Sequence, residues 1–201
     1  YLLTFCFFYP AMSQQFQPIK NCLFVNPIQT TGLSKAENND LKSIRNSIFV
    51  SGISFDEINS DRLSTKKLSG YEIVIIPVAT AKNLSAKQIS LLKESLNSGN
   101  NLLLDGESKL GKELGIVLKH ESLEVSQIRD FQFPDTPLYW TVEANVKPID
   151  ITGKNYKVIC VEDSTENPIV VSSSYGKGRF LYFSTYFDPN TTKGYSRFPF
   201  L

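Results

Sequence analysis

Short apolar runs, each about the length of a strand, recur through the first half of the chain. Tyr71–Pro77 is rich in β-branched residues and apolar at almost every position, which is typical of a strand buried on both faces of a parallel sheet. The runs Cys22–Val25 and Asn101–Asp105 have the same character, and Ile53–Phe55 is a weaker candidate. These runs predict the strands of one open sheet.

The segments between these runs carry helix signals. Ser34 and Ser85 are followed three residues later by Glu37 and Gln88, which is the spacing of a capping box. Behind each box, Leu and Ile recur on one helical face. A further short helix is expected after Ser108, which would be its N-cap. Strands that alternate with helices in this way predict a flavodoxin-like α/β fold, with an open, mostly parallel sheet and helices on both faces.

The pattern changes after about residue 120, where strand-like runs follow one another without a convincing helix. A tight turn at Tyr175–Arg179 joins the last two runs, which predicts an antiparallel hairpin. The sequence therefore predicts an antiparallel β extension at the C-terminal part of the sheet. The runs are Leu123–Ile128, Leu138–Val146, Tyr156–Val161, Ile169–Ser173 and Arg179–Ser184.

Composition and charge narrow the class of protein. The chain has 201 residues, of which 41% are hydrophobic, and this suits one globular domain rather than a disordered chain. Lys and Arg number 21 and Asp and Glu 20, which gives a formal net charge of +1. A dedicated nucleic-acid binder or a polybasic membrane anchor needs a basic excess. We therefore expect no nucleic acid among the partners.

The first 13 residues resemble the end of a secretory signal peptide. Residues 1–9 are uncharged and almost wholly apolar, and Ala11 and Ser13 form a small-x-small triplet that would place cleavage before Gln14. A buried N-terminal strand is the alternative. With cleavage, residues 14–20 are a leader, 21–190 the domain, and 191–201 the start of a truncated downstream segment. We predict an exported protein (periplasmic, cell-surface or extracellular). No membrane span is expected in the mature chain, because the apolar run is shorter than the roughly 20 residues that a span needs.

Cysteine and histidine are too few for a zinc site. If Cys6 leaves with the signal, Cys22 and Cys160 remain, and each lies in an apolar strand-like run. We expect both to be buried free cysteines, although export would permit a disulfide. The chain has one histidine, His120, and no CxxC motif. No metal site and no cofactor are predicted.

Several of these segments resemble class I glutamine amidotransferase-like domains. The resemblance rests on Tyr71–Pro77, the capped helix that ends at Gly99, the string Gly106–Ser108 and the closing hairpin Tyr175–Phe183, and it covers about residues 20–190. Similar domains occur upstream of polysaccharide deacetylase domains in secreted bacterial proteins. The stretches Leu114-Gly115-Ile116 and Tyr186-Phe187-Asp188-Pro189 are similar to segments found in that setting.

The catalytic residues that the resemblance implies are missing. Active amidotransferases place a cysteine on the turn between strand and helix and a histidine after a late strand. Here the turn reads Asp105–Ser108, and residues 185–189 contain no histidine. Ser108 lacks the G-x-S-x-G context of a nucleophilic serine and is better explained as an N-cap. We predict no catalytic residue in this chain and no glutamine hydrolysis.

Ligand contacts are expected at the carboxyl end of the sheet, where open α/β sheets bind their ligands. Asp105 and Glu107 stand at the end of a central strand, and Asn26, Thr80 and Ser108 are further candidate ligand-binding residues. The alternative is that the two carboxylates are solvated, or that they accept hydrogen bonds from the free N–H groups at a helix N-terminus. Core or sheet-face packing is the expected role of a group of aromatic residues, and a platform for sugar rings is the alternative. These residues are Tyr139, Trp140, Tyr182, Tyr186 and Phe187.

Three functions are consistent with these patterns. The first is a non-catalytic scaffold or binding domain of an exported bacterial carbohydrate-active protein, with a carbohydrate ligand and a downstream domain of the same polypeptide as partners. The second is the N-terminal part of a polysaccharide deacetylase whose metal site lies beyond Leu201. The third is an oligomerisation module that uses an exposed edge of the late hairpin.

Overall fold

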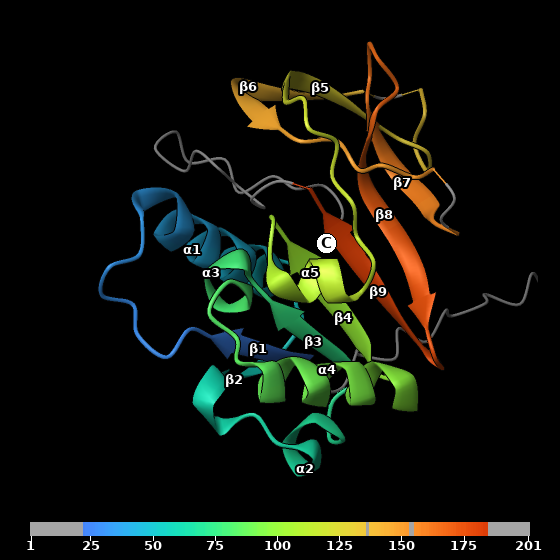
Figure 1. The fold of residues 1–201 in the computed structure, drawn as a ribbon. Coiled ribbons are helices and arrows are strands. Elements are labelled where there is room, and N and C mark those ends of the chain that lie inside the picture. The colour runs from blue at the N-terminus through green and yellow to red at the C-terminus, as the bar shows by residue number, and fades with distance from the viewer. Residues whose placement is uncertain (1–21, 136, 153–154, 185–201) are drawn as a thin grey trace, which may run out of the picture.

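The computed structural model describes residues 22–135, 137–152 and 155–184, which form an α/β fold around a single mixed sheet (Figure 1). The described strands follow the order β2-β1-β3-β4-β9-β8-β7-β5-β6. The predicted fold class is confirmed. The strands are β1 (Cys22–Asn26), β2 (Phe55–Asn59), β3 (Ile73–Ile76), β4 (Asn101–Asp105), β5 (Leu123–Asp130), β6 (Leu138–Val146), β7 (Lys157–Glu162), β8 (Pro168–Tyr175) and β9 (Gly178–Phe183).

One strand joins the parallel half of the sheet to the antiparallel half. The first four strands run parallel to one another, and β9 is parallel to β4 but antiparallel to β8. The remaining pairs, β7 with β8 and with β5, and β5 with β6, are all antiparallel. The predicted hairpin is confirmed, with Tyr175 opposite Gly178. Both of its strands lie inside the sheet, so the hairpin has no exposed edge, and β6 is the outermost described strand of this half.

Two helices cover opposite faces of the parallel half. Because side chains alternate along a strand, Val74 and Ile76 of β3 point to one face and Ile75 points to the other. The first face packs against Leu92 of α4, and the second against Ile44 of α1, so each face is a closed apolar layer. The helices are α1 (Lys35–Val50), α2 (Thr65–Leu68), α3 (Val78–Ala81), α4 (Ala86–Ser98) and α5 (Lys109–Glu113), with a 3-10 turn η1 (Ser60–Arg62).

The predicted helix starts are confirmed. The Ser34 hydroxyl accepts a hydrogen bond from the Glu37 backbone N–H, and the Glu37 carboxylate accepts one from the Ser34 N–H at 2.8 Å. Ser85 and Gln88 form the second capping box at the start of α4. The predictions missed α2 and α3 because a helix of four residues shows no 3.6-residue periodicity. Strand β2 begins two residues later than expected.

Other sequence expectations have mixed outcomes. Cys22 and Cys160 are buried and free, as predicted, and burial raises the pKa of the Cys22 thiol to about 11. No helix within the described ranges is long and apolar enough to cross a membrane. The signal peptide at 1–13, the leader at 14–20, Cys6 and the downstream segment at 191–201 lie outside the described residues, so they stay predictions.

Candidate functional site

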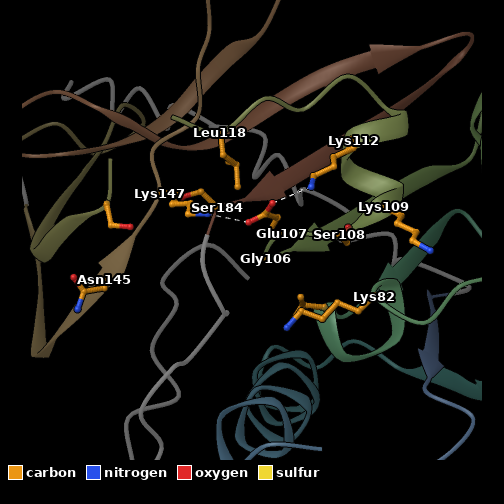
Figure 2. Close-up of a pocket in the computed structure, with 12 residues that line it drawn as sticks. Lys82, Gly106, Glu107, Ser108, Lys109, Lys112, Leu118, Asn145, Lys147 and Ser184 are labelled. Atoms are coloured by element: carbon orange, nitrogen blue, oxygen red, sulfur yellow. Dashed lines mark hydrogen bonds and ion pairs between the residues drawn. The ribbon is translucent and has the colours of Figure 1, made fainter. Parts of the chain in front are cut away.

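A hollow of about 520 Å³ lies at the carboxyl ends of β3, β4 and β9 (Figure 2). Part of its lining comes from residues that directly follow these strands, which are Val78 after β3, the turn 106–109 after β4 and Ser184 after β9. The rest consists of Lys82, Lys112, Leu118, Ser122, Asn145 and Lys147. A second hollow, of about 420 Å³, shares several of these residues and adds His120. The site is therefore where the topology of an open α/β sheet places a ligand.

The turn after β4 requires a glycine. Gly106 has a φ of +64°, and a Cβ at this position would lie 2.6 Å from Cγ2 of Val78, so a larger residue would be strained and would clash. Strand β9 fixes the turn, because the Gly106 N–H donates to the Phe183 carbonyl at 2.9 Å and the Tyr182 hydroxyl donates to the Gly106 carbonyl at 3.0 Å. Burial raises the pKa of Tyr182, which keeps this hydroxyl protonated as a donor.

Asp105, the last residue of the central strand β4, stabilises the fold. Its side chain is fully buried, and one carboxylate oxygen accepts a hydrogen bond of 2.6 Å from the Val78 N–H, the first amide of α3. A carboxylate at a helix N-terminus satisfies an unpaired donor and interacts favourably with the helix dipole. The alternative that the sequence left open for this residue, satisfaction by a helix N-terminus, matches this geometry.

Ser108 is the N-cap of α5, as predicted. Its hydroxyl accepts a hydrogen bond from the Gly111 N–H at 3.1 Å, and the residue is buried. His120 lies in the lining of the adjoining hollow and is exposed. Because the hydroxyl of Ser108 is engaged with the Gly111 N–H, this side chain acts as a helix cap.

Glu107 joins the two halves of the sheet through ion pairs. Its carboxylate contacts Nζ of Lys112 on α5 at 3.0 Å and Nζ of Lys147, beyond β6, at 3.2 Å. Figure 2 shows the two lysines reaching Glu107 from opposite sides. Hydrogen bonds from Lys112 and Lys147 hold the pKa of Glu107 below its ordinary value. The side chain is 46% exposed, so the carboxylate is charged and open to the hollow.

Asn26 and Thr80 lie apart from this hollow. The Thr80 hydroxyl is buried and donates to the Val25 carbonyl at 2.7 Å. The Asn26 amide donates to Glu57 at 2.8 Å, and its oxygen accepts from Arg45. Of the five predicted ligand-binding residues, the hollow therefore brings together Glu107 and Ser108.

The sequence did not predict the lysines that dominate the site. Among the described residues that line the two hollows, five are lysines and one, Glu107, is acidic. Two of these lysines, Lys109 and Lys112, lie on α5 at i, i+3. This spacing places them on one helix face, and it can be seen in the sequence. The lysines are Lys82, Lys109, Lys112, Lys119 and Lys147.

For Tyr182 the structure shows core packing, the alternative to a sugar platform. This side chain is 1% exposed and packs in the apolar layer beneath the turn. Tyr139 on β6 is 71% exposed, so it stays a candidate. Tyr186, Phe187 and the side chain of Trp140 lie outside the described part of the chain. Within the described ranges, no group of three or more His, Cys, Asp or Glu residues is placed to hold a metal ion.

Comparison with known proteins identifies the fold. No protein-family model and no curated protein matches the sequence. A ThuA-like protein from Bacteroides uniformis ATCC 8492 is 12% identical with a TM-score of 0.62, and the match covers 89% of this chain and 86% of that one. A cytoplasmic protein from Salmonella typhimurium LT2 is 13% identical with a TM-score of 0.53, over 85% and 89% of the two chains. The chain therefore shares its α/β fold with these proteins.

A second group of similar structures consists of parts of larger chains. A β-galactosidase from Bacillus circulans sp. alkalophilus is 15% identical with a TM-score of 0.60, over 83% of this chain and 29% of that one. An exo-β-1,4-mannosidase from Opitutaceae bacterium strain TAV5 is 12% identical with a TM-score of 0.58, over 82% and 31%. The chain thus spans less than a third of the length of these proteins.

Proposed function

We propose that this chain is a non-catalytic scaffold or binding domain of a carbohydrate-active protein. The fold also occurs as one part of solved β-galactosidases and of an exo-β-1,4-mannosidase, which supports such a setting. The hollow at the carboxyl ends of β3, β4 and β9 is its binding site. Its volume of about 520 Å³ lies within the range of about 300–1,000 Å³ that is typical of small-molecule sites.

One observation carries the proposal: each polar side chain at residues 105–108 has a structural partner. Asp105 binds the start of α3, Glu107 binds two lysines, and Ser108 caps α5. A hydrolase needs a nucleophile next to a base that takes its proton. The turn offers a rigid, charged wall to a ligand instead.

Two measurements on the purified chain test this function. The first is release of ammonia from glutamine, which we expect to equal the buffer blank. The second is retardation in native gels that contain soluble galactan, mannan or polygalacturonate, which we expect for at least one polysaccharide. Enzymatic ammonia release, or unchanged mobility in all three gels, would contradict the proposal.

An oligomerisation module is the second candidate function. The outermost described strand of the antiparallel half is β6, and Tyr139 on it is largely exposed. Phe131 and Phe133, which follow β5, are exposed as well. An uncovered edge strand is a template for pairing with a second chain. Light scattering after size exclusion tests this candidate. We expect a dimer that Tyr139→Lys dissociates, and a single-chain mass at every concentration would remove the candidate.

We also propose export and a carbohydrate-active downstream domain, such as a polysaccharide deacetylase. These proposals rest on the apolar segment 1–9, on Ala11 and Ser13, and on the resemblance of residues 20–190 to domains in that setting. N-terminal sequencing of the protein recovered from its native source tests export, with Gln14 as the expected first residue. The reading frame that follows the codon for Leu201 tests the downstream domain.

A further inference from the structure

Positive charge is concentrated at the hollow although the chain as a whole is nearly neutral. We call the cluster of Lys82, Lys109, Lys112 and Lys147 the lysine cluster. Against a net charge of +1 for 201 residues, the described part of this lining holds these four lysines and one acid, Glu107. A concave surface lined by one sign of charge raises the local concentration of oppositely charged ligands. The lining therefore favours an anion.

The partners of the lysines leave room for an added anion. Lys82 is already paired with Glu37, which lies outside the lining, at 3.2 Å, so the room for an anion lies at the other three lysines. Lys112 and Lys147 share the single carboxylate of Glu107, so two cations are balanced by one charge. Within the described ranges, Lys109 has no acidic partner. Exposed ion pairs contribute little to stability, so a ligand anion can replace Glu107 at these lysines with little loss.

Neutral polar groups lie beside the lysine cluster. Ser184 lines the hollow, and its hydroxyl is buried without a hydrogen-bond partner in the described part of the chain. Buried polar groups are almost always bonded, so an unpaired one in a hollow points to a ligand or water group. The exposed residues Ser122 and Asn145 add a hydroxyl and an amide, and Leu118 adds an apolar surface. This mixture suits the hydroxyls and C–H faces of a sugar.

From this arrangement we propose that the hollow binds the carboxylate of an acidic saccharide, a uronate, through the lysine cluster. The inference rests on the proposed carbohydrate-binding function and specifies its ligand class. A single concave site of about 520 Å³ fits a short charged saccharide. A nucleic acid needs a basic track along its backbone, and the near-neutral chain gives less support to that ligand.

Calorimetric titration of the full chain tests the inference. The probes are tri-galacturonate, neutral galactotriose of the same length, inorganic phosphate and a ten-nucleotide single-stranded DNA. The variant Lys109→Gln/Lys147→Gln removes two charges from the hollow, and Lys42→Gln/Lys87→Gln removes two exposed charges elsewhere. Lys109→Arg/Lys147→Arg keeps the charge, and the unfolding midpoint of each variant checks that it folds.

The expected result is a preference for tri-galacturonate over galactotriose of about tenfold or more. We expect the preference to be lost in the Gln variant of the hollow and kept in the control and Arg variants, and to weaken as salt rises. Equal binding of the two saccharides would overturn the uronate inference and leave the proposed function standing. If neither saccharide binds, whether or not phosphate or DNA does, the uronate inference is overturned. The proposed function then falls as well if mobility is unchanged in all three polysaccharide gels.

Discussion

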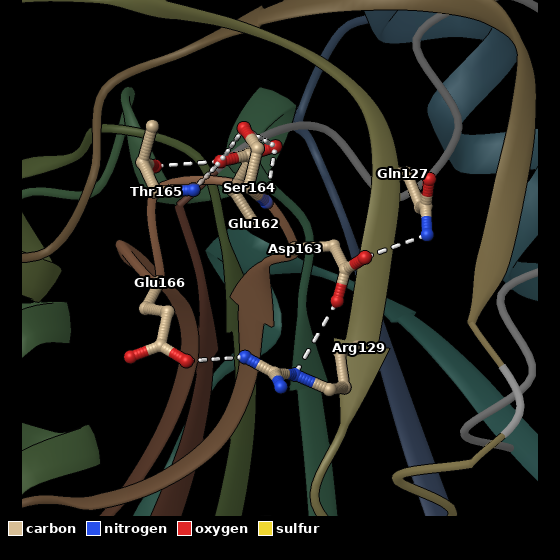
Figure 3. A network of polar contacts seen from close by, with 7 residues as sticks. All are labelled: Gln127, Arg129, Glu162, Asp163, Ser164, Thr165 and Glu166. Atoms are coloured by element: carbon tan, nitrogen blue, oxygen red, sulfur yellow. Dashed lines mark hydrogen bonds and ion pairs between the residues drawn. The ribbon is translucent and has the colours of Figure 1, made fainter.

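Two turns of this chain are each built around a glutamate, and they differ in what holds the carboxylate. Glu162, at the end of β7, accepts hydrogen bonds from the backbone N–H and hydroxyl groups of Ser164 and Thr165, two and three residues away (Figure 3). Glu107 is instead held by Lys112 and by Lys147, 40 residues away. The first network is local, and the second spans the fold.

Burial separates the two turns as well. Glu162 is 5% exposed, and its oxygens are saturated by four neighbouring donors. Beside it, Arg129 pairs with Asp163 at 3.4 Å and with Glu166 at 2.7 Å, so that corner is tied together internally. Glu107 is half exposed and faces a hollow. A saturated local network defines a turn, whereas an exposed long-range pair can exchange partners with a ligand.

The largest expected effect concerns Asp105, the buried neighbour of Glu107. Asp105→Ala removes the acceptor of the Val78 N–H and leaves that amide buried and unpaired. We expect the free energy of unfolding to fall by about 3 kcal/mol, measured by urea denaturation. Asp61→Ala, at an exposed position, is the matched control and should change it by under about 0.5 kcal/mol. A loss below about 1 kcal/mol for Asp105→Ala would show that the carboxylate is not needed at α3.

The Glu162 turn should be the next most sensitive. Glu162→Gln replaces acceptors with an amide that faces donors, and we expect a loss of about 2 kcal/mol at pH 7. Glu166→Gln, at the exposed end of the same turn, should cost under about 0.5 kcal/mol. Equal losses for the two variants would contradict the saturated network.

The same turn predicts a pH dependence with a definite sign. Burial alone raises the pKa of Glu162, but hydrogen bonds from Thr165 and Ser164 outweigh it and hold the pKa below its ordinary value of 4.5. The stabilisation is therefore complete above pH 4.5 and is lost as the pH falls through the lower folded pKa. Urea denaturation should show that the difference in free energy of unfolding between wild type and Glu162→Gln is smaller at pH 3 than at pH 7. A difference that widens at pH 3 would mean that folding raises the pKa of Glu162 instead of lowering it.

Local chemistry explains which features the sequence predicted. The capping boxes at Ser34 and Ser85, the cap at Ser108 and the buried strand β3 depend on residues within a few positions, and all were found. The lysine cluster was not found, because Lys147 and Glu107 are brought together by strand pairing between distant segments: β5 pairs with β6, and β9 joins β8 to β4. Contacts between distant segments leave no local pattern to read.

The sequence also could not predict that Asp105 is buried. A carboxylate at the end of a central strand looks like a ligand contact, and whether it faces the hollow or α3 depends on a helix of four residues, Val78–Ala81. The sequence predicts a strand that ends at Pro77 and assigns no element to residues 78–81. The sequence therefore allows two roles for Asp105, ligand contact or a hydrogen bond to a helix N-terminus. The position of α3 shows that Asp105 accepts from the first amide of that helix.

Glu107→Gln tests whether the exposed glutamate competes with a bound anion. The variant removes the acid that competes with an anionic ligand for Lys112 and Lys147, and we expect the affinity for tri-galacturonate to rise about fivefold, or ~1 kcal/mol. Stability should change by under about 1 kcal/mol, because both ion pairs are exposed. Glu94→Gln removes the same charge from an exposed site and should leave the affinity unchanged. A lower affinity in Glu107→Gln would mean that Glu107 itself binds the saccharide.

The smallest expected effect separates a cap from a nucleophile. Ser108→Ala removes the acceptor of the Gly111 N–H, and the loss of an N-cap lowers the free energy of unfolding by about 0.5–1 kcal/mol. Ser108→Thr keeps the hydroxyl and should recover most of that loss. Neither change should alter the affinity for tri-galacturonate by more than about twofold, because the lysines supply the charge. The opposite result would be a hydrolytic activity that both variants lose, although Ser108→Thr keeps the stability. Ser108 would then be a nucleophile, and the turn after β4 would be part of an active site.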